Sequence, residues 1–180
     1  MRIKEFRMGW EYFSGYFDGE GCLLFSIIRD GRSDKLKHNK GAEVHGWNII
    51  PQLSLQTGDY EVLNNMYNFL QNKNIDVAKM DIKKRRENQT KDFKRLSIYG
   101  WDNILKTIRY ILPYSISKKQ QLILFEEVFS IRKKQKIWTR DNFLKCMAVI
   151  DKINSYKGHY RNNIKTYSFF NKLWGSKNAS

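Results

Sequence analysis

Residues 13–21, with the sequence FSGYFDGEG, place two carboxylates among small and apolar side chains. Asp18 and Glu20 lie two positions apart, directly before a run of strand-forming residues. Outside this segment the chain has no phosphate-binding loop, no nucleophile elbow and no zinc-helix motif. Its three histidines are scattered, and we interpret them as surface residues. Any chemistry is therefore expected at residues 13–21 and at the elements that surround them.

Hydrophobic periodicity predicts those elements. Residues 9–18 favour a short helix that ends at a turn over residues 19–21, and residues 22–30 favour a strand. Residues 47–57 alternate between apolar and polar side chains, which is typical of a strand with one buried face. The remaining predicted elements are a loop at 31–46, a helix at 59–72, strands at 77–86 and 91–99, and helices at 101–112, 117–132 and 139–156.

This order predicts an α+β fold, with an antiparallel four-stranded sheet and helices on one of its faces. We expect a single domain over residues 1–156, followed by a basic and aromatic extension over residues 157–180. A last short helix is one option for this extension. The uncovered sheet face is either a solvated polar surface or a surface that reads DNA bases. The candidate DNA-contacting residues of this face and the adjoining loop are Ser26, Arg32, Asn48, Gln52, Ser54, Lys83, Arg85 and Arg95.

The first strand leaves one question open on this face. Alternation places Cys22, Leu24, Ser26, Ile28 and Asp30 on the same side, which makes that side unusually apolar. Leucine and isoleucine there would contact thymine methyl groups, or else a bulge bends the strand and changes its register.

The charge balance points to a polyanionic partner. Lysine and arginine total 33 against 18 acidic residues, a net charge of +15, in a chain whose 41% hydrophobic content is enough for a core. Nucleic acid is favoured over an anionic membrane, and a merely basic surface is the alternative. Two distant cysteines and the lack of an apolar run of spanning length predict an intracellular protein without a membrane segment. Abundant Ile, Lys, Asn, Phe and Tyr suit an AT-rich genome, so an organelle (chloroplast or mitochondrion) is one option.

Residues 13–21 resemble the signature motif of the LAGLIDADG homing endonucleases in their order of apolar, small and acidic positions. Two further segments resemble the family: Gln56 with the acidic and apolar residues at 59–63, and residues 112–120 around Pro113. The predicted element order is also similar to the family's αββαββα core, whose sheet is saddle-shaped. Ser14, Gly15 and Gly19 have almost no side chain, so two such helices are able to approach closely.

The resemblance implies a site-specific double-strand DNA endonuclease that promotes intron mobility and leaves 3′ overhangs. A single copy of the motif implies a homodimer on a long, pseudo-palindromic site. Mg²⁺ is the implied cofactor, with Mn²⁺ or Ca²⁺ as substitutes for binding, and Glu20 is its implied ligand. The implied catalytic residues are Glu20, Gln56 and Lys118, and the implied dimer interface comprises Ser14, Gly15, Asp18 and Gly19.

Some roles and one alternative function stay open at this stage. We expect Asp18 to be structural and to cap backbone amides at the interface. The family's basic residue after the second strand has no counterpart, because Asp59 and Tyr60 lie there, and strict alignment places Ser117 rather than Lys118 at its later lysine. The alternative function is an intron maturase, with RNA as its partner, or a non-cleaving nucleic-acid-binding protein on the same fold. A basic structural domain without a site is a third, weaker interpretation.

Overall fold

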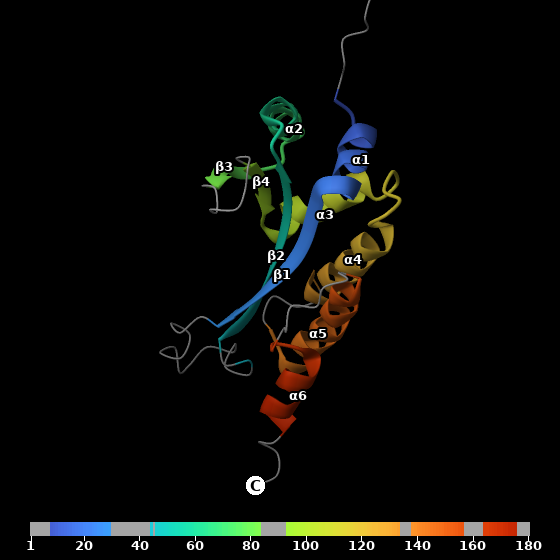
Figure 1. Cartoon of the computed structure of the whole chain (residues 1–180). Helices are drawn as coiled ribbons and strands as arrows, with labels where there is room; N and C mark the ends of the chain where they lie inside the picture. Colours follow the sequence, from blue (N-terminus) through green and yellow to red (C-terminus); the bar gives the residue numbers. More distant parts are fainter. Residues whose placement is uncertain are drawn as a thin grey trace, which may run out of the picture. The chain divides into compact units, whose positions relative to one another are not determined.

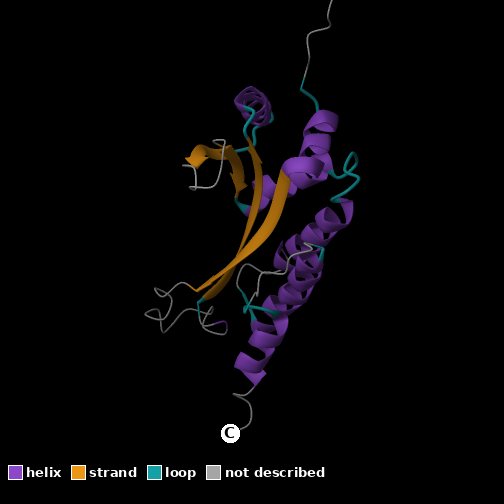
Figure 2. Ribbon diagram, viewed as in Figure 1, coloured by secondary structure: helices purple, strands orange, loops and turns teal. Residues whose placement is uncertain are grey.

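The computed structural model describes residues 8–29, 44, 46–83, 93–133, 138–156 and 164–175. Its elements, drawn in Figure 1 and Figure 2, follow the predicted order and add the last short helix. They are α1 (Trp10–Glu20), β1 (Gly21–Arg29), β2 (Trp47–Thr57), α2 (Tyr60–Asn72), β3 (Val77–Lys83), β4 (Phe93–Tyr99), α3 (Trp101–Ile111), α4 (Lys119–Lys133), α5 (Arg140–Ser155) and α6 (Tyr167–Gly175). The predicted loop at 31–46 lies almost entirely outside the described residues. Helix α6 lies within the predicted basic extension, whose separation from residues 1–156 stays a prediction.

The four strands form one sheet in the order β1-β2-β4-β3, which confirms the predicted α+β fold with a four-stranded sheet. Strand β4 is antiparallel to both β2 and β3. In the pairing of β2 with β4, Gln56 lies opposite Arg95 and Ser54 lies opposite Ser97. Of the three neighbouring pairs, β2 and β4 are the one whose strands do not follow each other in the chain, because α2 and β3 lie between them.

The burial of the two long strands follows their sequence alternation. In β2, Ile49, Leu53 and Leu55 are buried, as predicted. In β1, Leu23 and Ile27 are buried, whereas the outward-facing Cys22 and Ile28 are exposed and Leu24 and Ser26 are half-buried. Phe25, which lies between Leu24 and Ser26, is half-buried as well. Asp30 lies outside the described residues.

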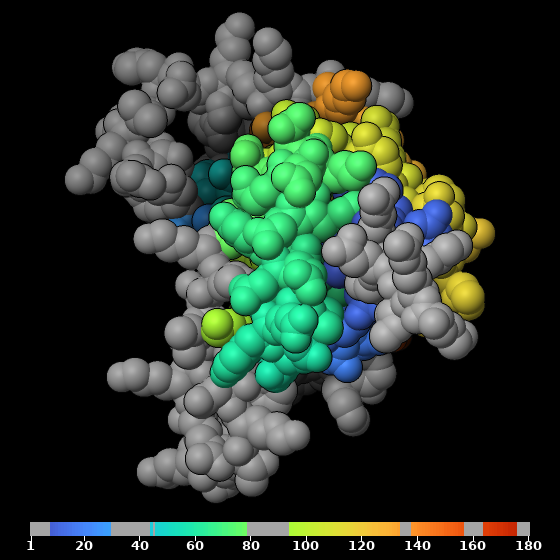
Figure 3. Space-filling model, turned by 90° about the horizontal axis from the view of Figure 1, so that it is seen from above, coloured from blue at the N-terminus to red at the C-terminus, as the bar shows by residue number. Residues whose placement is uncertain are grey.

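The chain divides into two compact units, of which the first comprises Met1–Leu24 and Pro51–Lys119. Its core contains Phe13 and Phe17 of α1, together with apolar faces of α2 and α3 that recur at helical spacing. Trp10 stacks on Tyr110 of α3, with ring centroids 4.6 Å apart, and its edge contacts Phe69 of α2. Figure 3 shows the surfaces of α2 and α1 side by side. Helices α2 and α3 both contact β4.

Helix α1 passes directly into β1, without the turn that the sequence predicted over residues 19–21. Gly21 makes this junction possible. A Cβ atom built on it would lie 2.2 Å from Cδ2 of Phe17 and 2.4 Å from the backbone oxygen of Phe17. Only glycine allows the strand to begin this close to the last helical turn. Glu20 is therefore the last residue of the helix rather than part of a loop.

The second unit comprises Phe25–Ile50 and Gln120–Ser180. An aromatic cluster connects its helices to β2: Phe170 of α6 packs against Trp47, Phe143 and Trp174 at centroid distances of 4.9–5.2 Å. Asp151 of α5 accepts a hydrogen bond of 2.8 Å from the first backbone amide of α6. On β1, Phe25 stacks on Phe125 of α4. Helix α6 is thus part of the core of this unit.

Candidate active site

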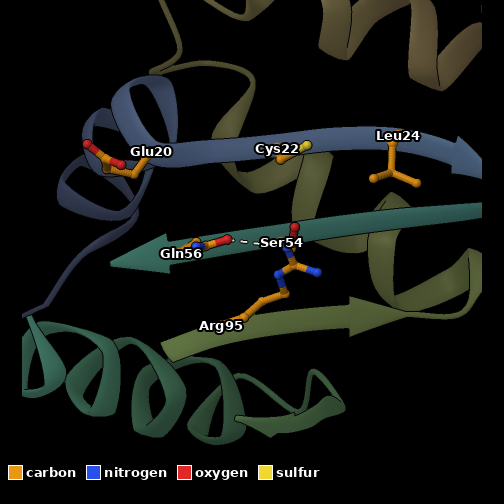
Figure 4. A pocket seen from close by; sticks show the side chains of 6 residues that line it. All are labelled: Glu20, Cys22, Leu24, Ser54, Gln56 and Arg95. Carbon is orange, nitrogen blue, oxygen red and sulfur yellow. Dashed lines mark hydrogen bonds between the residues drawn. The ribbon is translucent and has the colours of Figure 1, made fainter. Parts of the chain in front are cut away.

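A pocket of about 350 Å³ opens on the outward side of the sheet, within the first unit. Figure 4 shows that its lining comes from the end of α1 and from three strands. The lining residues are Glu20, Cys22, Leu24, Ser54, Gln56 and Arg95. The structure therefore brings together two of the three predicted catalytic residues, Glu20 and Gln56, which lie 36 positions apart in the sequence.

The carboxylate of Glu20 does not stabilise the helix that carries it. A negative charge at the C-terminal end of a helix interacts unfavourably with the helix dipole, and the last turn of α1 contains no basic residue. The side chain is exposed, and within the described ranges it has no hydrogen bond and no ion pair. An exposed carboxylate without a stabilising partner, at the rim of a pocket, is available to a cation.

Gln56 and Arg95 form a pair within the pocket. Nη2 of Arg95 donates a hydrogen bond of 3.2 Å to Oε1 of Gln56, shown by the dashed line in Figure 4. Nε of Arg95 is buried and has no hydrogen-bond partner in the described structure. Ser54 lies beside them and is only 5% exposed. A hydrogen bond thus holds the guanidinium against a side chain of the neighbouring strand.

Asp18 stabilises the contact between α1 and residues 115–118 of the same chain. Its carboxylate accepts hydrogen bonds from the Ser115 hydroxyl at 2.5 Å and from the backbone amides of residues 116–118 at 2.6–3.2 Å. Burial raises the pKa of Asp18, but these hydrogen bonds outweigh burial and lower the pKa below its ordinary value of 3.8. Asp18 caps backbone amides, as expected of a structural residue; its place in a dimer interface stays a prediction.

Lys118 does not line the pocket. Its Nζ donates a hydrogen bond to the backbone oxygen of Asp18 and lies 5.8 Å from the ring centroid of Phe17. A cation at the last carbonyls of a helix compensates the helix dipole. The structure thus gives Lys118 a capping position at the end of α1, and its predicted catalytic role has no support from the pocket geometry.

Helix α1 carries a stripe of Tyr12, Gly15, Tyr16 and Gly19 at the spacing of one helical face. Three of these residues are exposed and Tyr16 is half-buried. A Cβ atom added at either glycine would meet nothing within 4 Å of its own chain. Ser14 differs from the other residues predicted for the interface. It is fully buried and donates a hydrogen bond of 3.0 Å to the backbone oxygen of Ile111 in α3. It faces the core because it lies one position from the stripe, on the opposite side of the helix.

The predicted DNA-contacting residues divide into three groups. Arg32 and Arg85 lie outside the described residues, as does the side chain of Lys83. Ser26 and Gln52 are half-buried, and Nε2 of Gln52 donates to the Tyr99 hydroxyl at 3.3 Å. Of the other three residues, Ser54 is buried, Arg95 donates a hydrogen bond to Gln56, and the exposed Asn48 accepts a hydrogen bond of 2.9 Å from Nε1 of Trp138. Their contact with DNA stays a prediction.

The pairing of Arg95 with Gln56 could not be found from the sequence. Both residues were singled out, but for different roles, and no local pattern shows that β4 lies beside β2. The outward position of Cys22 and Leu24 follows from the sequence, because alternation along β1 places them on the face where the pocket opens.

The chemistry of the donor set suits magnesium in kind. Glu20 supplies carboxylate oxygens, which a hard divalent cation prefers. Within the described residues, no group of three or more His, Cys, Asp or Glu side chains is placed to hold a metal ion. One chain therefore offers one carboxylate at this pocket, which leaves other positions for water, phosphate oxygens or a second chain. Among the described helices, none is long and apolar enough to span a membrane.

Comparison with known proteins identifies the fold. No protein-family model and no curated protein matches the sequence. The structure, however, is similar to the homing endonuclease I-CvuI, solved with an I-CreI target in the presence of Mg, with a TM-score of 0.69, 13% identity and 95% of each chain covered. It is similar to the archaeal intron-encoded homing endonuclease I-Vdi141I, solved with DNA, with a TM-score of 0.67, 15% identity and coverage of 95% of this chain and 97% of that one.

The chain therefore has the fold of the LAGLIDADG homing endonucleases, and the resemblance carried by residues 13–21 is confirmed at the level of the fold. Its size corresponds to the single-motif type, since it covers nearly all of I-CvuI and I-Vdi141I. By contrast, it matches only 43% of the LAGLIDADG homing endonuclease I-SmaMI, with a TM-score of 0.58 and 17% identity.

Proposed function

We propose that this protein is a site-specific DNA endonuclease that acts as a homodimer and depends on Mg²⁺. The observation that carries the proposal is the meeting of Glu20 and Gln56 at one pocket, on a fold shared with homing endonucleases. The stability of helix α1 explains neither the unpartnered carboxylate of Glu20 at its end nor the position of this carboxylate beside the amide of Gln56. A fold alone does not establish an activity, so the proposal depends on these residues.

The exposed stripe of α1 supports a dimer. Gly15 and Gly19 lie in open space, so a second copy of the same helix is able to approach backbone to backbone. A twofold interface of this kind would bring two Glu20 side chains toward the axis, one from each subunit. The match to less than half of I-SmaMI supports the same conclusion, because two copies of this chain would equal one chain of that size.

The charge supports DNA as the substrate. A net charge of +15 supplies attraction to the phosphate backbone. The outward face of the sheet in the first unit offers the amide of Gln52, which is suited to hydrogen bonds with adenine. I-Vdi141I and I-SmaMI were both solved with DNA. Intron mobility is the biological role we infer.

The proposed reaction is phosphodiester hydrolysis. A bond forms between a water oxygen and phosphorus, the bond from phosphorus to the 3′ oxygen breaks, and the water proton passes to solvent while the 3′ oxygen gains one. Bound Mg²⁺ would polarise the phosphate and stabilise the leaving oxygen. Glu20 would hold the cation through its carboxylate, and Gln56 would make hydrogen bonds beside the phosphate. Cutting the two strands across the minor groove would leave 3′ overhangs.

The first test incubates the protein with intronless DNA from its source organism and Mg²⁺. We expect defined double-strand breaks for the wild type and none for Glu20→Gln, which keeps the shape of the side chain but loses its charge. Glu11→Gln is the matched control, because Glu11 lies on the same helix but not at the pocket. DNA affinity of Glu20→Gln, measured in Ca²⁺, should stay within about tenfold of wild type, or 1.4 kcal/mol.

Cleavage by Glu20→Gln at the wild-type rate would show that Glu20 is not the metal ligand. Binding of intron RNA by a wild type that leaves all DNA intact would favour the maturase alternative and contradict the proposal.

A further inference from the structure

The contact between Arg95 and Gln56 fixes the orientation of an amide. The two residues lie directly opposite each other in the antiparallel pairing of β4 with β2. Nη2 of Arg95 lies 3.2 Å from one terminal atom of Gln56. A guanidinium has five N–H donors and no acceptor, so the Gln56 atom that it contacts must be the carbonyl oxygen.

The same contact determines what Gln56 offers to the pocket. With Oε1 held by Arg95, Nε2 is the remaining terminal atom, and no hydrogen bond among the described residues uses it. Gln56 lines the pocket together with Glu20. The amide therefore offers its N–H donors to the pocket, where an anionic group such as a phosphate would accept them. An N–H donor suits a phosphate oxygen and does not suit a cation.

Arg95 itself is poorly placed to read a base. Bidentate recognition of guanine needs two guanidinium N–H groups directed at the base, whereas the bond from one N–H of Nη2 to Gln56 directs the guanidinium toward the neighbouring strand. The side chain is half-buried, and its Nε is buried without a partner in the described structure. These features describe a guanidinium held within the protein, rather than one extended toward a DNA groove.

We propose that Arg95 is a positioning residue, which holds the Gln56 amide so that its NH2 group donates a hydrogen bond to the phosphate being cleaved. This inference rests on the proposed nuclease function. It assigns Arg95 to the cleavage step rather than to base reading. It also makes Gln56 a donor rather than a ligand of the metal.

The test measures single-turnover cleavage of the DNA fragment found in the first experiment. We expect Arg95→Ala and Gln56→Ala each to slow cleavage, the latter by about 100-fold, the usual effect of losing one transition-state donor. The double variant should be no slower than Gln56→Ala alone, because Arg95 acts only through Gln56. Affinity for the same DNA in Ca²⁺ and the preference among base substitutions should not change, and Arg95→Lys should recover part of the rate.

Gln56→Glu separates the two possible roles of Gln56. A glutamate keeps an oxygen for Arg95 and offers oxygens to a metal, but it has no N–H donor. We expect it to cleave as slowly as Gln56→Ala. Faster cleavage by Gln56→Glu than by Gln56→Ala would overturn the donor role. Additive rate losses in the double variant, or altered base preference in Arg95→Ala, would overturn the positioning role.

A measurement without DNA tests the contact directly. The NMR signals of the Gln56 side-chain NH2 group are assigned by their loss in Gln56→Ala. We expect them to shift in Arg95→Ala and to stay in place in Lys94→Ala, which changes the neighbouring residue on the opposite face of β4. Unchanged signals in Arg95→Ala would overturn the inference. A wild type that cleaves no DNA would instead overturn the proposed function, and these signals would still decide whether Arg95 holds the amide.

Discussion

Replacing Gly15 by valine should abolish the dimer without harming the subunit. A Cβ atom at this position meets nothing within 4 Å of its own chain. Valine also has a slightly higher helix propensity than glycine, so the isolated subunit should gain about 0.3 kcal/mol. Across a close helix pair, however, added bulk typically costs about 1–3 kcal/mol, and twofold symmetry counts this cost twice. The dimer should therefore weaken by about 2–6 kcal/mol, or about 30-fold to about 20,000-fold in dissociation constant.

Sedimentation velocity over a range of protein concentrations measures the dimer, and thermal unfolding measures the subunit. Two glycines of the same chain serve as controls. Gly175→Val, at the end of α6, also adds a side chain in open space and should leave both measurements unchanged. Gly21→Val should unfold the subunit itself, because its Cβ would overlap Phe17. A Gly15→Val protein that sediments as a dimer at wild-type concentrations would refute the location of the interface, and a monomeric wild type would refute the dimer.

Four further predictions concern other parts of the chain. Asp18→Asn should lower the free energy of unfolding at pH 7 by about 2 kcal/mol, because a charged acceptor of several hydrogen bonds is lost. Since the pKa of Asp18 in the folded state lies below 3.8, this difference should be complete above that pH and disappear as the pH falls below it, as measured by urea unfolding. Phe170→Ala should destabilise the second unit by about 3–5 kcal/mol in the same assay, because its fully buried ring fills an aromatic cluster. Gln52→Ala should relax base preference by about 1–3 kcal/mol without changing the salt dependence of DNA binding. Lys133 is exposed in the last turn of α4. If it contacts the DNA backbone, Lys133→Ala should flatten the slope of log affinity against log salt by about one unit for all sequences.

Each of these predictions has a contrary outcome. A stability difference for Asp18→Asn that does not shrink as the pH falls below 3.8 would mean that the carboxylate charge is not what stabilises this contact. An unaltered unfolding curve for Phe170→Ala would contradict the assignment of α6 to the core of the second unit. A change of base preference in Lys133→Ala, together with none in Gln52→Ala, would mean that the sheet is not the surface that reads bases.

The sequence alone determined the elements and the motif. Ile49, Leu53 and Leu55 alternate because a strand presents every second side chain to one face, and the structure confirms them as buried. The helices at 59–72 and 101–112 follow from apolar residues at helical spacing, which is equally local. The motif at residues 13–21 indicated the fold and directed attention to Glu20. All of this information lies within about ten residues of each position it describes.

Tertiary structure decided which of these residues meet. The sheet order β1-β2-β4-β3 places Arg95 opposite Gln56, although 39 positions separate them. The hydrogen bonds of Asp18 reach residues 97–100 positions away, and those of Ser14 turn it toward α3 rather than toward a partner. Strand order and helix packing depend on how several apolar faces are buried at once, and no local pattern records that choice. The sequence therefore named most residues of the pocket, while their partners became visible only in the folded chain.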